Sequence, residues 1–207
     1  MTIHTFALGQ MQANCYLLEE AGKCLLIDPA DSADFILEKI QSKNLELVGI
    51  VATHGHFDHI MAVGEIQLSY PHLSLHIHKK DEFLLTRLAE TAEHFLGYNP
   101  MVMPVRLKAA LTPGSFSIAP FSFDVLFTPG HTPGSCCIHF KSDNILFTGD
   151  TLFQGGIGRY DFSYSDKGEL KKSLQKILKL PGETIIYPGH GEESRIEYEQ
   201  EVLNTFF

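Results

Sequence analysis

The stretch VGIVATHGHFDHI, residues 48–60, constrains this chain more than any other. It opens with a short run rich in Val and Ile, which predicts a buried strand because it is too short and too β-branched for a helix. Four metal-type side chains then follow within six residues: His54, His56, Asp58 and His59. Open α/β sheets place their chemistry at the carboxyl ends of strands, so this loop is where we expect an active site.

The spacing of these four side chains suits a metal ion. His54 and His56 lie two apart in extended or loop backbone and can turn their rings to the same side. Asp58 and His59 follow on a turn and can face the same small space from the other side. Imidazole with carboxylate suits zinc, and also iron or manganese. The alternative, a polar His-rich loop without a metal, is disfavoured because four ligand-type residues lie so close together.

Composition excludes several classes of function. The chain has 207 residues and is 44% hydrophobic, which is enough to bury a sizeable core as one large domain or two small ones. No segment approaches the ~20 apolar residues of a membrane span. The net charge of −9 argues against a nucleic-acid partner, whose binders usually carry a basic face. We expect a single domain over residues 1–207 that acts on a small molecule, with neither nucleic acid nor a membrane as partner; the oligomeric state is not indicated.

The termini and cysteines favour the cytoplasm. The first residues lack the basic-then-apolar order of a secretory signal. The four cysteines contain no CxxC pair, which suits reduced thiols better than a disulfide framework. We interpret the adjacent Cys136 and Cys137 as core residues of a strand rather than as nucleophiles.

The order of elements indicates two αβ halves packed sheet on sheet. In the first half we expect strands at 3–8, 14–19, 23–28, 46–52 and 74–78, with helices at 31–42, 60–68 and 80–90. In the second we expect strands at 121–127, 135–141, 144–148 and 184–187, with helices at 166–179 and from about 194. The Pro-containing stretch 91–115 between them has no regular pattern, and it either covers the core or forms a lid over the active site.

Asp28, His76 and His78 are given structural roles. Asp28 ends the third strand, and we expect it to cap the next element rather than to support the His-rich loop from behind. His76 and His78 repeat the two-apart spacing, but no carboxylate follows them as Asp58 follows His56. We therefore interpret both histidines as ordinary strand positions.

Three further metal-type side chains each follow a predicted strand. His131 lies between two Pro-Gly turns in the segment 128–134, which fixes its loop. Asp150 follows Gly149, and His190 follows Pro-Gly at 188–189. Singly these are weak signals, but together with the first loop they make seven candidate ligands at four strand ends.

Seven side chains suffice for two ions of four protein ligands each if one carboxylate bridges both. Asp150 is the candidate bridge because its carboxylate has two oxygens. We expect the first ion to be held by His54, His56 and His131, and the second by Asp58, His59 and His190. Ions in such sites lie ~3.5–4 Å apart, and a water that they share readily loses its proton.

These motifs resemble the metallo-β-lactamase superfamily over nearly the whole chain. The resemblance lies in THGHFDH at 53–59 followed by His131, Asp150 and His190, and the segments GDTLF at 149–153 and GGIGR at 155–159 are similar to short, single-domain glyoxalase II-like hydrolases. It implies an α+β fold, an αββα four-layer sandwich of two mixed sheets with helices on the outer faces. It also implies two divalent metal ions, usually zinc with iron or manganese tolerated, and hydrolysis of a thioester such as S-lactoylglutathione.

Departures from the pattern narrow this resemblance. True β-lactamases of the fold usually have cysteine where Asp150 stands, and its diiron flavoproteins have glutamate where His56 stands, so both activities are disfavoured. Arg159 matches a basic residue that contacts a glutathione carboxylate in the family. We therefore expect Arg159 to contact substrate rather than only to pair with Asp161 or Asp166 on the surface. Asp161 stands where the family usually has tyrosine, as does Glu192, and the basic C-terminal region that holds glutathione has no counterpart after His190.

The resulting expectation is a metal-dependent thioester hydrolase in which Asp58 and Asp150 orient the attacking hydroxide. One rival is a mononuclear-iron dioxygenase that acts on glutathione persulfide. Its iron would be held by His54 or His56 together with His131 and Asp150. A second rival is a phosphodiesterase or nuclease, disfavoured by the acidic balance and the lack of a basic stripe. The last is a metal-binding module without catalysis.

Overall fold

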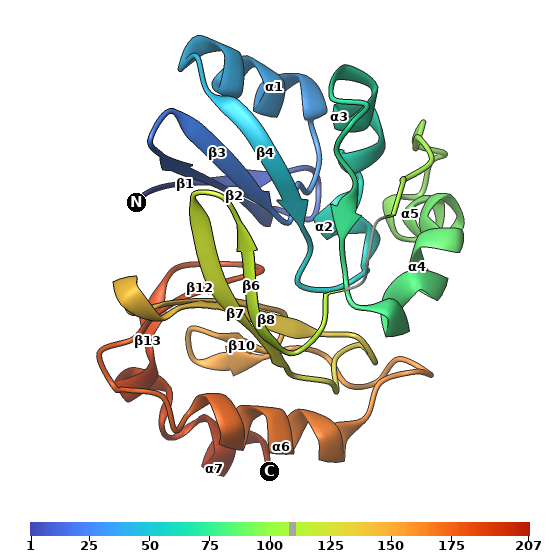
Figure 1. The fold of residues 1–207 in the computed structure, drawn as a ribbon. Helices are drawn as coiled ribbons and strands as arrows, with labels where there is room; N and C mark the ends of the chain where they lie inside the picture. The colour runs from blue at the N-terminus through green and yellow to red at the C-terminus, as the bar shows by residue number, and fades with distance from the viewer. Residues whose placement is uncertain (108–110) are drawn as a thin grey trace.

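Two β-sheets face each other in the middle of the molecule, with helices outside them (Figure 1). The computed structural model describes residues 1–107 and 111–207, so part of the predicted irregular stretch, residues 108–110, lies outside the described residues. One sheet has the strand order β1-β2-β3-β4-β5 and the other β13-β12-β9-β8-β7-β6, and each contains both parallel and antiparallel pairs. This confirms the predicted αββα sandwich of two mixed sheets.

The first half of the chain forms the first sheet and five helices. Its elements are β1 (Thr2–Leu8), β2 (Ala13–Glu20), β3 (Lys23–Ile27), α1 (Ala33–Ser42), β4 (Glu46–Val51), α2 (Phe57–Ile60), α3 (Val63–Ser69), β5 (Leu75–His76), the 3-10 turn η1 (Lys79–Asp81), α4 (Glu82–Thr86) and α5 (Leu88–Leu96). The predicted strands are confirmed, the fifth of them only over Leu75–His76. The predicted helix at 60–68 corresponds to α3, which begins later, at Val63, and the predicted helix at 80–90 is divided between α4 and α5. The predicted irregular stretch begins too early, because α5 continues to Leu96 and ends at Gly97 in the left-handed region, with φ of 77°.

Among the described residues, the second half forms the second sheet, a separate two-stranded sheet of β10 and β11, and two helices. Its elements are β6 (Gly114–Ile118), β7 (Phe121–Phe127), β8 (Cys136–Phe140), the 3-10 turn η2 (Lys141–Asp143), β9 (Ile145–Gly149), β10 (Leu152–Phe153), β11 (Gly156–Ile157), α6 (Lys167–Ile177), β12 (Ile185–Pro188), β13 (Ser194–Arg195), the 3-10 turn η3 (Ile196–Glu199) and α7 (Val202–Phe206). The predicted helix from about 194 is wrong at its start, where β13 pairs with β12, and α7 has only five residues. The edge strand β6 was not predicted.

The core between the sheets explains why the central strands are apolar on both faces. Successive residues of a strand point to opposite faces. In β3, Leu25 and Ile27 pack toward the second sheet with Phe147 and Ile138, whereas Leu26 packs under the helices of the first half. All four cysteines are buried and free, as the core interpretation of Cys136 and Cys137 requires.

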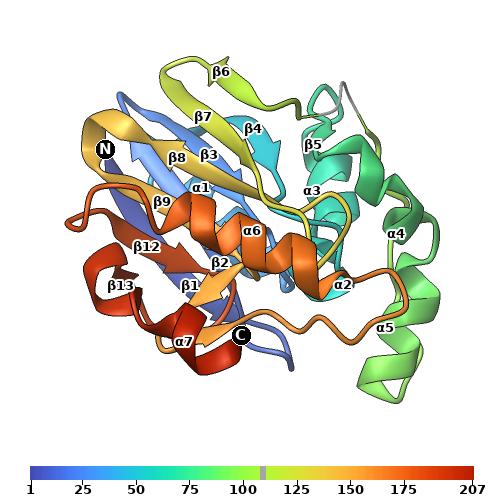
Figure 2. The same ribbon diagram turned by 90° about the horizontal axis from the view of Figure 1, so that it is seen from below.

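Helix α6 lies along the outer face of the second sheet, with α7 beside it (Figure 2). Leu170, Leu174 and Ile177 are buried against the sheet at helical spacing, and the lysines between them lie on the outer side of the helix. The Asp166 carboxylate caps this helix by accepting from the Glu169 N–H at 2.9 Å. In the part of the chain that the structure describes, no helix is long and apolar enough to cross a membrane.

Candidate metal centre

Backbone hydrogen bonds hold four strand-end loops against one another. The Cys136 N–H donates to the Thr53 carbonyl at 2.8 Å and so ties the loop after β7 to the loop after β4, across the two sheets. The Gly189 N–H donates to the Gly149 carbonyl at 2.8 Å, and the Asn14 N–H donates to the Gly189 carbonyl, also at 2.8 Å. Each loop that carries a candidate ligand is therefore fixed by main-chain contacts that do not depend on its ligand side chain.

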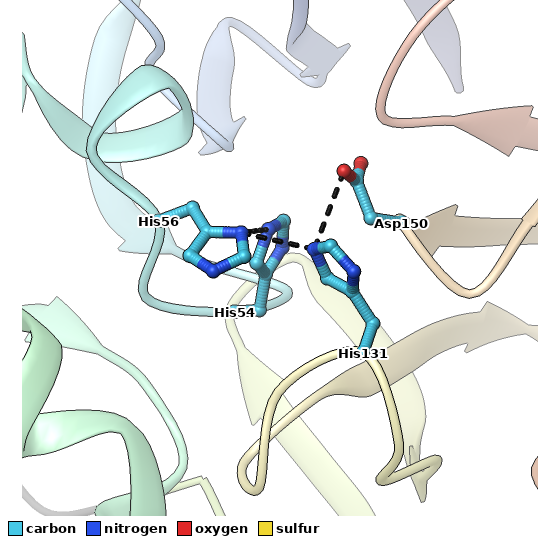
Figure 3. A group of neighbouring side chains, drawn as sticks. All are labelled: His54, His56, His131 and Asp150. Carbon is cyan, nitrogen blue, oxygen red and sulfur yellow. Dashed lines mark hydrogen bonds and ion pairs between the residues drawn. The ribbon is translucent and has the colours of Figure 1, made fainter. Parts of the chain in front are cut away.

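A first cluster contains His54, His56, His131 and Asp150, whose ligand-type atoms all lie within 4.8 Å of one another. Figure 3 shows the three imidazoles and the carboxylate pointing toward one another, with His54 and His56 on one loop and His131 and Asp150 each on another. His56 Nδ1 lies 3.1 Å from His54 Nε2 and 2.9 Å from His131 Nε2. His131 Nε2 lies 3.4 Å from Asp150 Oδ2.

A second cluster contains Asp58, His59 and His190. Asp58 Oδ2 lies 3.3 Å from His190 Nε2 and 3.7 Å from His59 Nε2. Asp150 adjoins this cluster as well, with Oδ1 3.4 Å from His59 Nε2 and Oδ2 3.9 Å from His190 Nε2. The structure thus brings all seven predicted residues together, with the Asp150 carboxylate between the two groups.

Hydrogen bonds to the outer ring nitrogens orient two imidazoles of the first cluster. His131 Nδ1 lies 2.7 Å from the Arg159 carbonyl, which can only accept, so Nδ1 carries the proton and Nε2 presents a lone pair. Thr53 Oγ1 donates to Asp28 Oδ2 at 2.7 Å and therefore accepts from His54 Nδ1 at 3.0 Å. His54 Nε2 then also carries a lone pair. The lone pairs of His54 Nε2 and His131 Nε2 both face His56 Nδ1. These lone pairs need either a proton on His56 Nδ1 or a cation among the rings, and a cation would be bound by all three nitrogens when His56 carries its proton on Nε2.

Two buried polar atoms support the same conclusion. His59 Nε2 and Asp150 Oδ1 have no hydrogen-bond partner among the described residues, although buried polar groups nearly always have one. They face each other across 3.4 Å at the junction of the two clusters. Five imidazoles and two carboxylates of this geometry fit a dinuclear metal centre, and this donor set is compatible with zinc, iron or manganese.

The two clusters differ in the charge of their histidines. Burial lowers the pKa of His54 well below its usual value and lowers that of His56 to about 3. Burial acts in the same direction on His59, but the neighbouring Asp150 and Asp58 carboxylates outweigh it and raise the pKa of His59 well above its usual value. The pKa of His190 is also raised, since hydrogen bonding to Asp58 and the charge of Asp150 outweigh its burial.

We therefore expect acidification to release metal from the second cluster first. In the metal-free protein His59 and His190 hold protons below their raised pKa values, and these protons must leave before the nitrogens bind a cation. Affinity at this cluster falls as the pH drops through those values, whereas His54 and His56 stay neutral to much lower pH. Metal content per chain after equilibrium dialysis between about pH 8 and pH 4 should fall in two steps. A His190→Ala control should show only the step at lower pH, and simultaneous loss of both ions from the unmodified protein would contradict the expectation.

Asp28 supports the His-rich loop, so the prediction that it caps the next element was wrong. Its buried carboxylate accepts from the Thr53 N–H and Thr53 Oγ1, each at 2.7 Å, and lies 3.3 Å from His59 Nδ1. Helix α1 instead has Ser32 at its N-cap, without a side-chain cap. The physical reason is the backbone of Asp28, whose φ of 50° turns the side chain back toward the end of the parallel neighbour β4.

Asp81 is a functional position that the sequence reasoning missed. Its fully buried carboxylate accepts from the Gly55 N–H at 2.9 Å, the Gly134 N–H at 2.6 Å and Thr132 Oγ1 at 2.6 Å. It therefore joins the loop of His54 and His56 to the loop of His131. A Cβ on Gly134 would lie only 2.6 Å from the Asp81 carboxylate, so this close approach requires glycine, but the sequence alone does not indicate which side chain approaches it.

A cavity of about 270 Å³ opens beside the clusters. Tyr164 lines it and was also missed; its hydroxyl lies 2.9 Å from His56 Nε2, the nitrogen that faces away from His54 and His131. Thr91 and Phe95 of α5 contribute to its wall, which places part of the predicted irregular stretch beside the clusters.

Arg159 also lines this cavity. Its Nε and Nη2 donate to the two carboxylate oxygens of Asp161, each at 2.9 Å, whereas Asp166 caps α6. Among the described residues, His76 and His78 join neither metal-type cluster. They contact the rings of Phe116 and Phe127 instead. His76 lies in β5, but His78 lies after that strand and caps η1, so the prediction that both are strand positions was wrong for His78.

Comparisons with known proteins agree with this geometry. The family model of the Metallo-beta-lactamase superfamily matches residues 8–190. The chain is 34% identical to "Probable metallo-hydrolase YqgX" of Bacillus subtilis, covering 96% of each chain. It is 33% identical to "Hydroxyacylglutathione hydrolase GloC" of Haemophilus influenzae, covering 97% of this chain and 95% of the relative. Among solved structures, the di-iron-bound form of TTHA1623 superimposes with a TM-score of 0.88 at 33% identity, over 96% of this chain and 98% of that one.

Proposed function

Since this chain belongs to the metallo-β-lactamase superfamily, we propose that it is a thioester hydrolase of the glyoxalase II type that uses two zinc ions. The family and the relative named as a metallo-hydrolase indicate a metal-dependent hydrolase of this superfamily. The thioester substrate is supported by the relative named hydroxyacylglutathione hydrolase, which matches nearly end to end. The di-iron-bound neighbour makes iron the second choice of metal.

The observation that carries the proposal is the position of Asp150 between two clusters that open into one small cavity. We assign one ion to His54, His56 and His131, the other to Asp58, His59 and His190, and both to Asp150. When bound by these residues, two divalent ions would supply Lewis-acid polarisation of a substrate carbonyl and would lower the pKa of a water between them.

The chain's own residues orient the reaction. Burial would raise the pKa of Asp58, but the charges of His59 and His190 outweigh it and hold that pKa below its usual value. Asp58 is therefore ionised at neutral pH and can accept a hydrogen bond from the attacking water, as can Asp150. The cavity wall excludes bulk water and holds the acyl group, and Arg159 contacts the substrate at its rim.

A turnover screen with metal analysis of the same sample tests the proposal. The metal-loaded protein should hydrolyse thioesters of glutathione, coenzyme A or an uncharged thiol, with two ions per chain and no oxygen consumption. One iron per chain with oxygen consumed on glutathione persulfide would favour the dioxygenase. Cleavage of a phosphodiester alone would favour the nuclease, and no turnover by a fully loaded sample would leave a metal-binding module.

A further inference from the structure

The cavity beside the clusters is walled by large apolar side chains from both halves of the chain. These are Met11, Phe57, Phe95, Phe153, Ile157 and Phe162. Two stacked ring pairs contribute to it. Phe57 and Phe95 lie 5.7 Å apart between ring centroids at 16°, and Phe162 and Tyr164 lie 5.5 Å apart at 16°. Flat aromatic walls favour an apolar or aromatic group, which gains both burial and offset stacking.

The one Lys or Arg side chain that lines the cavity in the described part of the chain is already paired. Arg159 binds both carboxylate oxygens of Asp161 in the bidentate arrangement, and its Cζ lies 4.5 Å from the centroid of the Phe162 ring. Both partners are largely exposed, so the pair contributes little to folding. The pair instead affects binding at the rim of the cavity, because the negative charge of Asp161 repels a substrate carboxylate that approaches the Arg159 guanidinium.

Apart from the proposed metal ions and the histidines, the described cavity wall offers a substrate carboxylate no cationic group besides Arg159. The other charged groups of the cavity wall, outside the histidines, are Asp58 and Asp150, and the whole chain carries a net charge of −9. A substrate tail that bears carboxylates must therefore displace Asp161 from Arg159 before it gains an ion pair.

We propose that Asp161 is a specificity-determining residue: by occupying Arg159 it makes the cavity select thioesters whose enclosed group is uncharged and apolar, arylacyl groups included. This inference rests on the proposed thioester hydrolysis and names its substrate class. It also changes the role of Arg159 from a receptor for a substrate carboxylate to a neutralised part of the cavity wall.

The kinetic test compares butanoyl and succinyl thioesters of N-acetylcysteamine, which have the same carbon chain and differ by one carboxylate. The unmodified protein should prefer the butanoyl substrate in kcat/KM. Asp161→Asn frees Arg159 and should reduce that preference about tenfold, mainly through a lower KM for the succinyl substrate. Adding Arg159→Gln to Asp161→Asn should restore the original ratio.

Asp166→Asn is the matched control, because it removes the same charge from the same loop without touching Arg159, and asparagine still caps a helix. It should leave the butanoyl-to-succinyl ratio within about twofold of the original. A ratio that does not respond to Asp161→Asn, or an original preference for succinyl, would overturn the inference.

Ligand binding separates failure of this inference from failure of the proposed function. Phenylacetate and succinate are titrated into the metal-loaded protein by calorimetry, without any turnover. The preference of the cavity is supported if phenylacetate binds more tightly than succinate and if Asp161→Asn reduces this difference in affinity. If no thioester is then hydrolysed, only the proposed function is wrong. If phenylacetate and succinate bind equally tightly, both to the unmodified protein and to Asp161→Asn, the preference is contradicted whatever the activity.

Discussion

We expect the replacement of Asp150 with alanine to abolish turnover while the fold survives. Asp150 is the side chain whose two oxygens adjoin both clusters, at 3.4 Å from His59 and 3.4 Å from His131. Loss of a residue that only supports a ligand typically costs ~10–100-fold in metal affinity or activity, so loss of a shared ligand should cost more. The fold survives because the backbone bond from Gly189 to Gly149 holds the loop without this carboxylate.

The measurement combines kcat/KM, metal content per chain and the thermal transition. His56→Ala should also lose turnover while the fold survives, and the metal that it loses should be that of the first cluster. Asp143→Ala, a change to an exposed carboxylate of η2, serves as the control that keeps both ions and full turnover. An Asp150→Ala protein with two ions and near-normal activity would exclude the bridging role.

Replacing Asp28 with asparagine destabilises the metal-free protein and weakens its second cluster. The carboxylate serves two donors on Thr53 and faces His59 Nδ1, and an amide nitrogen in place of one oxygen would oppose a donor. Breaking a buried charged arrangement of this kind typically costs about 3–5 kcal/mol. Asparagine tolerates the left-handed backbone at this position, so the change tests the carboxylate and not the backbone.

Urea unfolding with and without chelator measures the free energy of unfolding, and dialysis measures the metal retained. Asp31→Asn is the matched control, since this carboxylate accepts only from the adjacent Ser32 N–H in the described contacts, and it should change the free energy by less than about 0.5 kcal/mol. Equal stability of Asp28→Asn and the unmodified protein would show that Asp28 does not support the loop.

The sandwich and the clustered ligands could be predicted because both leave short-range signals in the sequence. Strands that are buried on both faces, such as β3, are continuous apolar runs, and such runs indicate a sheet covered on each side. The candidate ligands follow strands directly, at Gly149-Asp150 and Gly189-His190 for example. The chemistry of a side chain and its place after a strand are both local properties.

The features that could not be predicted are contacts between segments that lie far apart in the sequence. The support by Asp28 of Thr53, 25 residues away, follows from one backbone angle and the parallel pairing of β3 with β4. Asp81 is part of a predicted helix, and nothing in the sequence tells that its carboxylate reaches Gly134. Strand β6 was missed because it is a partly exposed edge strand that begins with glycine and serine.

The ligands of both clusters come from loops of both sheets, and this has a thermodynamic consequence. An ion that needs all of these loops binds the native chain and not the unfolded one, so its binding free energy is added to the free energy of unfolding. At a free-ion concentration of 100 times the dissociation constant this linkage amounts to about 2.7 kcal/mol, a substantial share of the ~5–15 kcal/mol typical of a domain. The free-ion concentration in the surroundings then sets the fraction of chains that is folded, as temperature does.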